Sequence, residues 1–395
     1  MKTILTSGIG IWIVLFALFL PFTYSFFPHF GYELTNSLSS ISEWVAKDAL
    51  EINIYSSPTT SDSAAQFVQA FLLLIIAFLL VVIARKQRRF SEIEIGRFLH
   101  TSAAYILSFF LLKYGVDKLF QFQFYAPEPN TLFTPLGMLS KDILFWSSMG
   151  TSSSYNTFMG LSEIIPAFLL LHHRTRLLGG LIALGVLVNV LMINFSFDIT
   201  VKLLSMYLVT VSIYVISPFL KNLYSFFISH SESSAKPEKR IQLKPKVRTV
   251  VKSIVVILLF TEILFSYVQV RSFNGREMEK IAHFGSYEVT QADADVLGYQ
   301  NVHRIHIHSK GYLILEDKEG SFVDFPIRIA PDQSIIVRKE NARFFVSKNG
   351  SKAVFKIQKD GKSVDILTRK IDLDALPARD DSFHWTVDGL IDAQK

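Results

Sequence analysis

The sequence predicts an α-helical membrane bundle of about seven transmembrane helices joined to an extracytoplasmic all-β domain. The chain has 395 residues, of which 50% are apolar, and its mean hydropathy is +0.33. Residues 1–270 contain long apolar runs, each close to the roughly 20 residues that a helix needs to cross a bilayer. From Arg271 onward, short runs of alternating character replace them, which is typical of strands.

Seven apolar runs are candidate transmembrane spans. They are Ile4–Phe26, Ala65–Ala84, Phe98–Leu119, Thr157–Leu171, Leu177–Phe195, Val201–Pro218 and Val250–Val270. The first run has an alternative interpretation as a cleaved secretory signal peptide, which would leave six spans. Its length, Pro21 and its aromatic residues fit a cleavage site poorly.

The basic residues of the connecting segments predict the orientation. Lys and Arg cluster in segments 85–97, 174–176 and 236–248, which fall on the same side as Lys2. The opposite segments, 27–64 and 120–156, each contain a single basic residue, Lys47 and Lys141 respectively. Because basic loops stay in the cytoplasm, the N-terminus is expected inside, and seven crossings place the C-terminus outside the inner membrane.

The formal net charge of +6 arises entirely from the membrane part. Residues 1–270 contain 21 basic and 15 acidic residues, whereas residues 271–395 contain 19 of each. This distribution fits a membrane protein with basic cytoplasmic loops and argues against a nucleic-acid partner. The bilayer is the expected partner, together with an extracytoplasmic or redox protein.

These patterns divide the chain into five segments. They are two N-terminal transmembrane helices with an extracytoplasmic loop (1–96), a four-helix core (97–222), a basic cytoplasmic linker (223–249), a seventh transmembrane helix (250–270) and the β domain (271–395). Its part 229–248 is rich in Ser, Lys and Pro, which is typical of a flexible hinge. Its basic residues are favoured as a topology signal, and the alternative is that they bind anionic headgroups.

The β domain is expected to be an antiparallel meander closed as a small barrel or sandwich. Candidate strands are Ser286–Thr290, Val302–His308, Tyr312–Glu316, Phe322–Ile329, Ser334–Arg338, Ala353–Gln358 and Val364–Thr368. Phe383-His384-Trp385 is predicted to close the barrel. His306 and His308 share one strand face, and a polar outward face is favoured over a metal site because no further ligands can be placed.

Polar residues at membrane depth are the candidate functional site, since ionisable groups in a span are costly and usually functional. All are expected in the outer half of the bilayer or at its edge: Lys113, Asp117, Lys118, Glu163, Asn189, Asn194, Asp198, Lys202 and Glu262. They could form an outward-facing pocket for a lipid headgroup, a quinone or a proton relay. The alternative is an ion-pair network that fixes helix packing.

Absent residues and motifs exclude several kinds of chemistry. The chain has no cysteine, which excludes disulfides, thiolate catalysis, iron–sulfur clusters, cysteine-zinc sites and covalently attached haem. It also contains no Walker A loop, G-x-G-x-x-G, H-E-x-x-H or G-x-S-x-G. An enzyme is therefore the less favoured expectation.

Three groups of motifs follow one another between residues 97 and 222. They are Tyr114-Gly115-Val116-Asp117-Lys118 with Gln123-Phe124 and Pro127-Glu128-Pro129, then Gly160-Leu161-Ser162-Glu163 with Arg174-Thr175-Arg176-Leu177-Leu178-Gly179, and then Asn189 to Lys202 with Asn194-Phe195 and Asp198. In order and spacing they resemble the four-helix core of the DoxX-like bacterial membrane proteins. The wider layout resembles a subgroup with two extra N-terminal helices and a C-terminal β domain.

The resemblance implies little about activity, because most members of the family have no assigned function. DoxX relatives include a subunit of a thiosulfate:quinone oxidoreductase and redox-associated proteins of the MauE kind. The Gly, Lys, Glu and Arg positions of the family correspond by motif to Gly115, Lys118, Glu163 and Arg174, and no catalytic role comes with them. A cysteine-dependent redox role cannot apply to this chain.

The favoured function is that of an accessory membrane subunit that binds a quinone-like or lipid-like molecule, with Glu163 and Lys118 as the central pair. One alternative is a membrane component of a quinone-linked oxidoreductase, whose redox centre a partner would carry. Another is a proton-coupled small-solute transporter using Glu163 and Glu262, although the sequence contains no inverted repeat.

Overall fold

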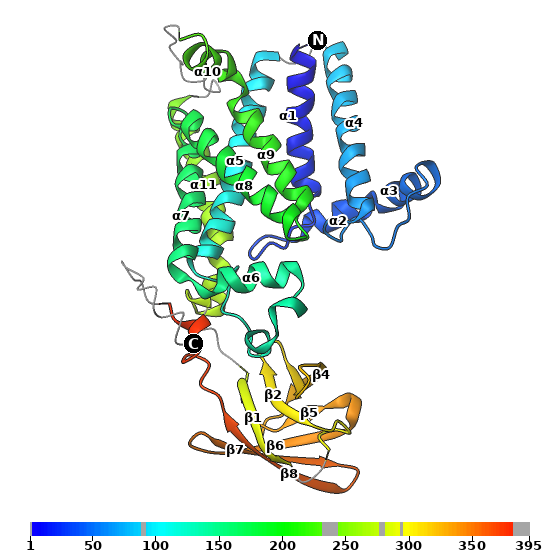
Figure 1. Cartoon of the computed structure of the whole chain (residues 1–395). Helices are drawn as coiled ribbons and strands as arrows, with labels where there is room; N and C mark the ends of the chain where they lie inside the picture. The colour runs from blue at the N-terminus through cyan, green and yellow to red at the C-terminus, as the bar shows by residue number, and fades with distance from the viewer. Residues whose placement is uncertain (1, 88–91, 231–243, 276–280, 293–294, 382–395) are drawn as a thin grey trace. The chain divides into compact units, whose positions relative to one another are not determined.

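Figure 1 presents the computed structural model, which describes residues 2–87, 92–230, 244–275, 281–292 and 295–381. The chain forms two compact units. The helical unit comprises residues 1–120 and 157–273, and the barrel unit comprises residues 121–156 and 274–395. The segment 121–156, which we call the insert, therefore groups with the C-terminal part, a grouping that the sequence patterns did not indicate.

The helical unit is built from long helices that run side by side, with α2 and α3 lying across one end of α1 and α4 (Figure 1). Helix α1 packs against α4, α5 and α9, and α8 packs against α9. The bounds are α1 Lys2–Phe19, α2 Phe30–Ser37, α3 Ser39–Trp44, the π-helix Val45–Ala49, α4 Ala64–Gln87, α5 Glu92–Leu119, α7 Ser153–Leu171, α8 Arg176–Ser196, α9 Lys202–Ile216, the 3₁₀ turn Ser217–Phe219, α10 Leu220–Phe227 and α11 Pro245–Val270.

Prolines lie at the C-terminal end of one helix in this unit and at the N-terminal end of another. Helix α1 ends at Phe19, shortly before Pro21, and residues 20–29 form a non-helical strap between α1 and α2. Helix α11 begins at Pro245. Proline is tolerated at this position because the N–H groups of the first turn have no acceptor within the helix. It ends before Arg271, whose left-handed φ of 54° stops the helix.

Five helices among the described residues are long and apolar enough to cross a membrane: Ala64–Lys86, Glu94–Leu119, Arg176–Ser196, Lys202–Phe227 and Pro245–Val270. They match five of the seven predicted spans. The first predicted span is helical only to Phe19, and its apolar helix Ile4–Phe19 is shorter than the others. The fourth lies in α7, whose first turn is polar and which contains Pro166. A count of seven crossings therefore stays a prediction.

The barrel unit contains a closed barrel of eight antiparallel strands, in which each strand pairs with the next and β8 pairs with β1. The strands are β1 Gly285–Ala292, β2 Val302–His308, β3 Tyr312–Asp317, β4 Phe322–Ile329, β5 Ile335–Val337, β6 Ala342–Asn349, β7 Lys352–Lys359 and β8 Lys362–Lys370. Inward-facing Tyr287, Ile305, Phe344, Phe355 and Ile366 are fully buried in the core. The predicted β meander is thus a barrel rather than a sandwich.

The sequence patterns missed strand β6. Its run Phe344-Phe345-Val346 interrupts the alternation that marks a half-buried strand, and charged residues flank it. In the structure Phe344 points into the core and Phe345 outward, with Arg343 over the outward ring at 5.2 Å. The chain fits two adjacent aromatics by placing one on each face of the sheet.

Short helices complete the barrel unit. The insert contains the 3₁₀ turns η2 Thr131–Phe133 and η3 Leu136–Met138 and the helix α6 Lys141–Thr151, and two further 3₁₀ turns lie at η6 Arg338–Glu340 and η7 Pro377–Arg379. Phe124 packs against Phe145 and Trp146, with ring centroids 5.9 and 4.7 Å apart. Residues 231–243 of the predicted linker and the predicted Phe383-His384-Trp385 closure lie outside the described residues.

Candidate functional site

A buried ion pair joins α5 to α7. The Lys118 ammonium lies 2.9 and 2.8 Å from the two carboxylate oxygens of Glu163, and the two side chains are only 7% and 5% exposed. Two glycines allow the helices to approach this closely, since a Cβ at Gly160 would lie 2.7 Å from the Gly115 carbonyl oxygen. The pair is therefore shielded from solvent. Because water cannot solvate either charge there, each charge is stabilised by its partner.

A second charged group ties α5 to α11. The Lys113 ammonium lies 2.7 and 2.8 Å from the carboxylate oxygens of Asp117, one helical turn away. The Tyr267 hydroxyl of α11 donates to the same carboxylate, and the ammonium lies 5.8 Å from the Tyr267 ring centroid. Tyr267 was not among the predicted site residues, because a lone tyrosine in an apolar helix looks like ordinary packing.

Glu262 of α11 binds backbone amides of the strap. The N–H groups of Ser25, Phe26 and Phe27 donate to its carboxylate at 2.5, 3.0 and 3.0 Å. The Glu262 residue is 1% exposed. Three consecutive amides that converge on one carboxylate form a strong anion clamp, so Glu262 fixes the strap against α11.

The other predicted residues lie apart from these groups. Lys202 pairs with the exposed Asp198 at 2.6 Å, and Asn194 is buried, whereas Asn189 is exposed. Sequence reasoning missed Asp62, whose carboxylate accepts the first two amides of α9, those of Lys202 and Leu203, at 2.7 and 2.9 Å. The nine predicted residues thus form several separate groups rather than one open pocket.

An apolar groove lies between α1, α5 and α11. Its volume is about 290 Å³, and it is lined by Val14, Ala17, Leu18, Tyr24, Tyr105, Ile106, Phe109, Phe110, Val255 and Leu259. The polar side-chain atoms in this lining are the hydroxyls of Tyr24 and Tyr105, and neither has a hydrogen-bond partner among the described residues. Tyr24 belongs to the strap and stacks on Phe30 and Phe109, so it stands at the strap end of the groove.

A polar relay lies on the outer face of the barrel. The Ser286 hydroxyl is 2.8 Å from Nδ1 of His306, whose Nε2 is 3.0 Å from Glu316, and Arg304 pairs with Glu316 at 2.6 Å. These residues face away from the core, as strand alternation predicts for His306. Ser, His and acid are the residue types of a nucleophilic triad, but Ser286 and His306 are fully buried beneath the insert, so the hydroxyl is closed to a substrate.

The relay and its neighbours fasten the insert to the barrel. Phe133 of the insert packs on Arg304, whose guanidinium carbon is 4.5 Å from the ring centroid. Glu128 of the insert accepts the backbone amide of Ser309 at 3.2 Å and also its hydroxyl, and lies 3.7 Å from His308. The described residues contain no group of three or more His, Cys, Asp or Glu side chains placed to hold a metal ion.

Docking of the insert is expected to weaken at acidic pH. Burial lowers the pKa of His306 below its usual 6.5, although Glu316 partly opposes this, and burial also lowers the pKa of His308. Below pH 6.5 the unfolded chain therefore binds more protons than the folded one, and stability is lost as the pH falls through this range. Hydrogen exchange of residues 127–138 between about pH 5 and 8 measures this.

The matched variants are His306→Gln and His303→Gln. His306→Gln should reduce the pH dependence of exchange in the insert, whereas the same change at the neighbouring His303 should leave it unaltered. An unchanged pH dependence in His306→Gln would show that His306 does not carry the effect.

Comparison with known proteins identifies one partial relative and no family. Over 60 residues, 15% of this chain, the sequence is 45% identical to the uncharacterized protein YwoB of Bacillus subtilis (strain 168). The match covers 39% of the length of that protein. No protein-family model and no solved structure matches the chain.

Proposed function

We propose that this chain is a multi-pass membrane protein that binds a quinone-like or lipid-like molecule in the groove between α1, α5 and α11, and that it acts as a non-catalytic accessory subunit. The groove is the observation that carries the proposal. It combines an apolar lining with two tyrosine hydroxyls that have no hydrogen-bond partner among the described residues. Ligand sites commonly pair an apolar surface with a few polar groups that fix orientation.

The groove matches the chemistry of an amphipathic ligand. Ile106, Phe109, Val255 and Leu259 offer a surface for an isoprenoid or acyl chain. The Tyr24 hydroxyl at the strap end supplies a hydrogen bond for a carbonyl or ester oxygen of the head. In this proposal Glu262 does not contact the ligand but holds the strap that carries Tyr24.

The buried charges have a structural role in this proposal. Lys118 and Glu163 satisfy each other, and Asp117 is satisfied by Lys113 and Tyr267. They stabilise the packing of α5 against α7 and α11, and α5 and α11 both contribute residues to the lining of the groove. This is the packing network that the sequence offered as the alternative to a polar pocket.

Topology and family belong to the same proposal. The basic segments favour a cytoplasmic N-terminus and an extracytoplasmic barrel unit at the inner membrane. The motifs around Lys118 and Glu163 support a DoxX-like origin of the core helices, since the pair joins two motifs of that resemblance. A redox or other extracytoplasmic protein partner would then meet the barrel unit.

The groove is tested by filling it. Ala17→Trp adds a large side chain to the lining, and Ala84→Trp makes the same change at an exposed position of α4. Native mass spectrometry of the gently purified protein should find a bound small molecule in the wild type and in Ala84→Trp and should find it lost in Ala17→Trp. Equal retention in both variants would remove the groove as the binding site.

A further inference from the structure

The open end of the barrel beside Gly285 concentrates positive charge. Strand β1 begins there, and β6 and β8 end there. Lys348 continues the inward-facing row of Phe344 and Val346 on β6, and Lys370 continues that of Ile366 and Thr368 on β8. Both rows therefore finish in a lysine at the same mouth of the barrel.

These two lysines are not neutralised. Neither has an ion-pair partner among the described residues. The strand register aligns Lys348 with Ala353 of β7 and with Thr368 of β8, two residues before Lys370. Burial, followed by the charge of Lys370, lowers the pKa of Lys348. His283 lies at the same mouth, where its Nε2 is 2.9 Å from the carbonyl oxygen of Gln333, and both lysine charges lower its pKa in addition to burial. Like charges held together at the mouth of a barrel leave a local positive potential.

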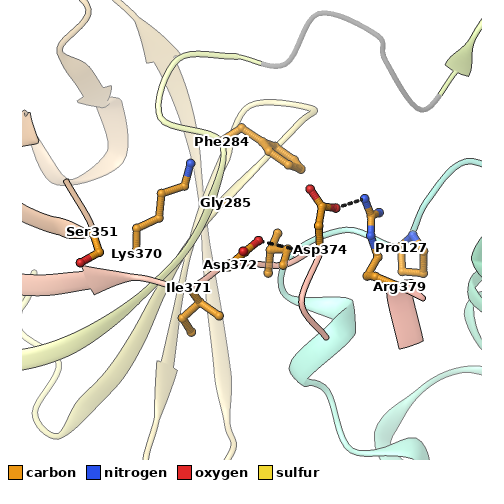
Figure 2. A pocket seen from close by; sticks show the side chains of 10 residues that line it. Pro127, Phe284, Gly285, Ser351, Lys370, Ile371, Asp372, Asp374 and Arg379 are labelled. Carbon is orange, nitrogen blue, oxygen red and sulfur yellow. Dashed lines mark hydrogen bonds and ion pairs between the residues drawn. The ribbon is translucent and has the colours of Figure 1, made fainter. Parts of the chain in front are cut away.

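A pocket of about 280 Å³ opens beside Lys370. Its lining includes Phe284, Gly285, Ser351 and Lys370 together with Asp372, Asp374 and Arg379. Figure 2 shows the Lys370 ammonium on one side of the pocket and the Arg379–Asp374 pair on the other, with the Phe284 ring between them. Gly285 keeps the lysine side open, because a Cβ there would lie 3.2 Å from Cε of Lys370 and its φ is +133°.

The acidic residues of the pocket are already engaged. Asp374 pairs with Arg379 at 2.7 Å, and Asp372 accepts the backbone amide of Asp374 at 3.1 Å. Arg379 is paired with Asp374, so Lys370 is the lysine that lines the pocket, and the Ser351 hydroxyl adds a hydrogen-bond donor beside it. Lys348 stands at the same mouth of the barrel, outside the pocket lining. A compact anion with several acceptor oxygens matches this set of donors.

We propose that the mouth of the barrel binds a phosphate-type oxyanion between Lys370, Lys348 and Ser351, with the Phe284 ring against the organic part of the ligand. Mouths of barrels are common ligand sites. The oxyanion could belong to a soluble phosphate ester or to a phospholipid headgroup. The proposal concerns the barrel unit alone and does not depend on the groove of the helical unit.

The test is calorimetric titration of the full-length protein in detergent with inorganic phosphate and with sn-glycerol 3-phosphate. Wild type is expected to bind at least one of them saturably. Lys370→Met and Lys348→Met should each weaken binding by about tenfold, the loss expected when a hydrogen bond to a charged group is removed. Lys370→Arg should retain it.

The matched control is Lys362→Met, which removes an exposed lysine at the opposite end of β8. It should bind as the wild type does. Absence of saturable binding to wild type, or equal weakening in Lys362→Met, would overturn the proposal. Repeating the titration in nanodiscs distinguishes the two sources of the oxyanion: a site filled by a headgroup will be blocked in phosphatidylglycerol discs, whereas a site for soluble esters will stay open.

Discussion

Removing either partner of the Lys118–Glu163 pair is expected to destabilise the helical unit by about 3–5 kcal/mol, because the remaining charge stays buried and unpaired. Glu163→Gln and Lys118→Met test this in the detergent-solubilised protein, with thermal unfolding as the readout. Both side chains are almost fully buried at the contact of α5 and α7. In both variants the backbone amides of α5 and α7 should also exchange faster with solvent than in the wild type.

The double variant separates a packing role from a ligand-binding role. Lys118→Met combined with Glu163→Gln should recover most of the lost stability, since neither buried charge is then left alone. Additive losses in the double variant would contradict a mutual pair. Asp198→Asn, which removes one partner of an exposed pair, is the matched control and should change stability by no more than about 1 kcal/mol.

Glu262→Ala is expected to free the strap. Three backbone amides lose their acceptor, and hydrogen bonds to a charged group contribute about 1.5–3 kcal/mol each. Amides of residues 25–27 should exchange much faster, and the ligand held near Tyr24 should be lost with them. Hydrogen exchange followed by mass spectrometry measures the first effect, and native mass spectrometry the second.

The control for the strap is Glu33→Ala, which removes an exposed carboxylate from α2. In Glu33→Ala the amides of residues 25–27 should remain protected from hydrogen exchange. Glu262→Gln keeps an acceptor oxygen and should show an intermediate effect. Protection of residues 25–27 that survives in Glu262→Ala would show that the clamp does not hold the strap.

Sequence reasoning was most informative where one periodicity or one charge decides the structure. Apolar runs located five helices that are long enough to cross a bilayer, and alternation located seven of the eight strands. The cost of a buried charge singled out Lys118, Glu163 and Glu262, all of which are at most 6% exposed. These features depend on local composition, which the sequence displays directly.

Features that depend on distant partners could not be predicted. Glu262 binds backbone amides of residues 25–27, and amides have no side-chain signature. The sequence left open whether the meander closes as a barrel or packs as a sandwich, because barrel closure depends on β8 pairing with the distant β1. The groove draws its lining from α1, α5 and α11, and apolar residues that line a groove are of the same types as those that face lipid.

Photo-cross-linking in native membranes tests the central claim most directly. A photoreactive amino acid replaces Ile106 in the groove or, as the control, the exposed Phe98 on the same helix, and the captured molecules are identified by mass spectrometry. The proposal predicts that position 106 captures one dominant amphipathic molecule, whereas position 98 captures the bulk lipids. The same lipid mixture at both positions would contradict a specific binding groove.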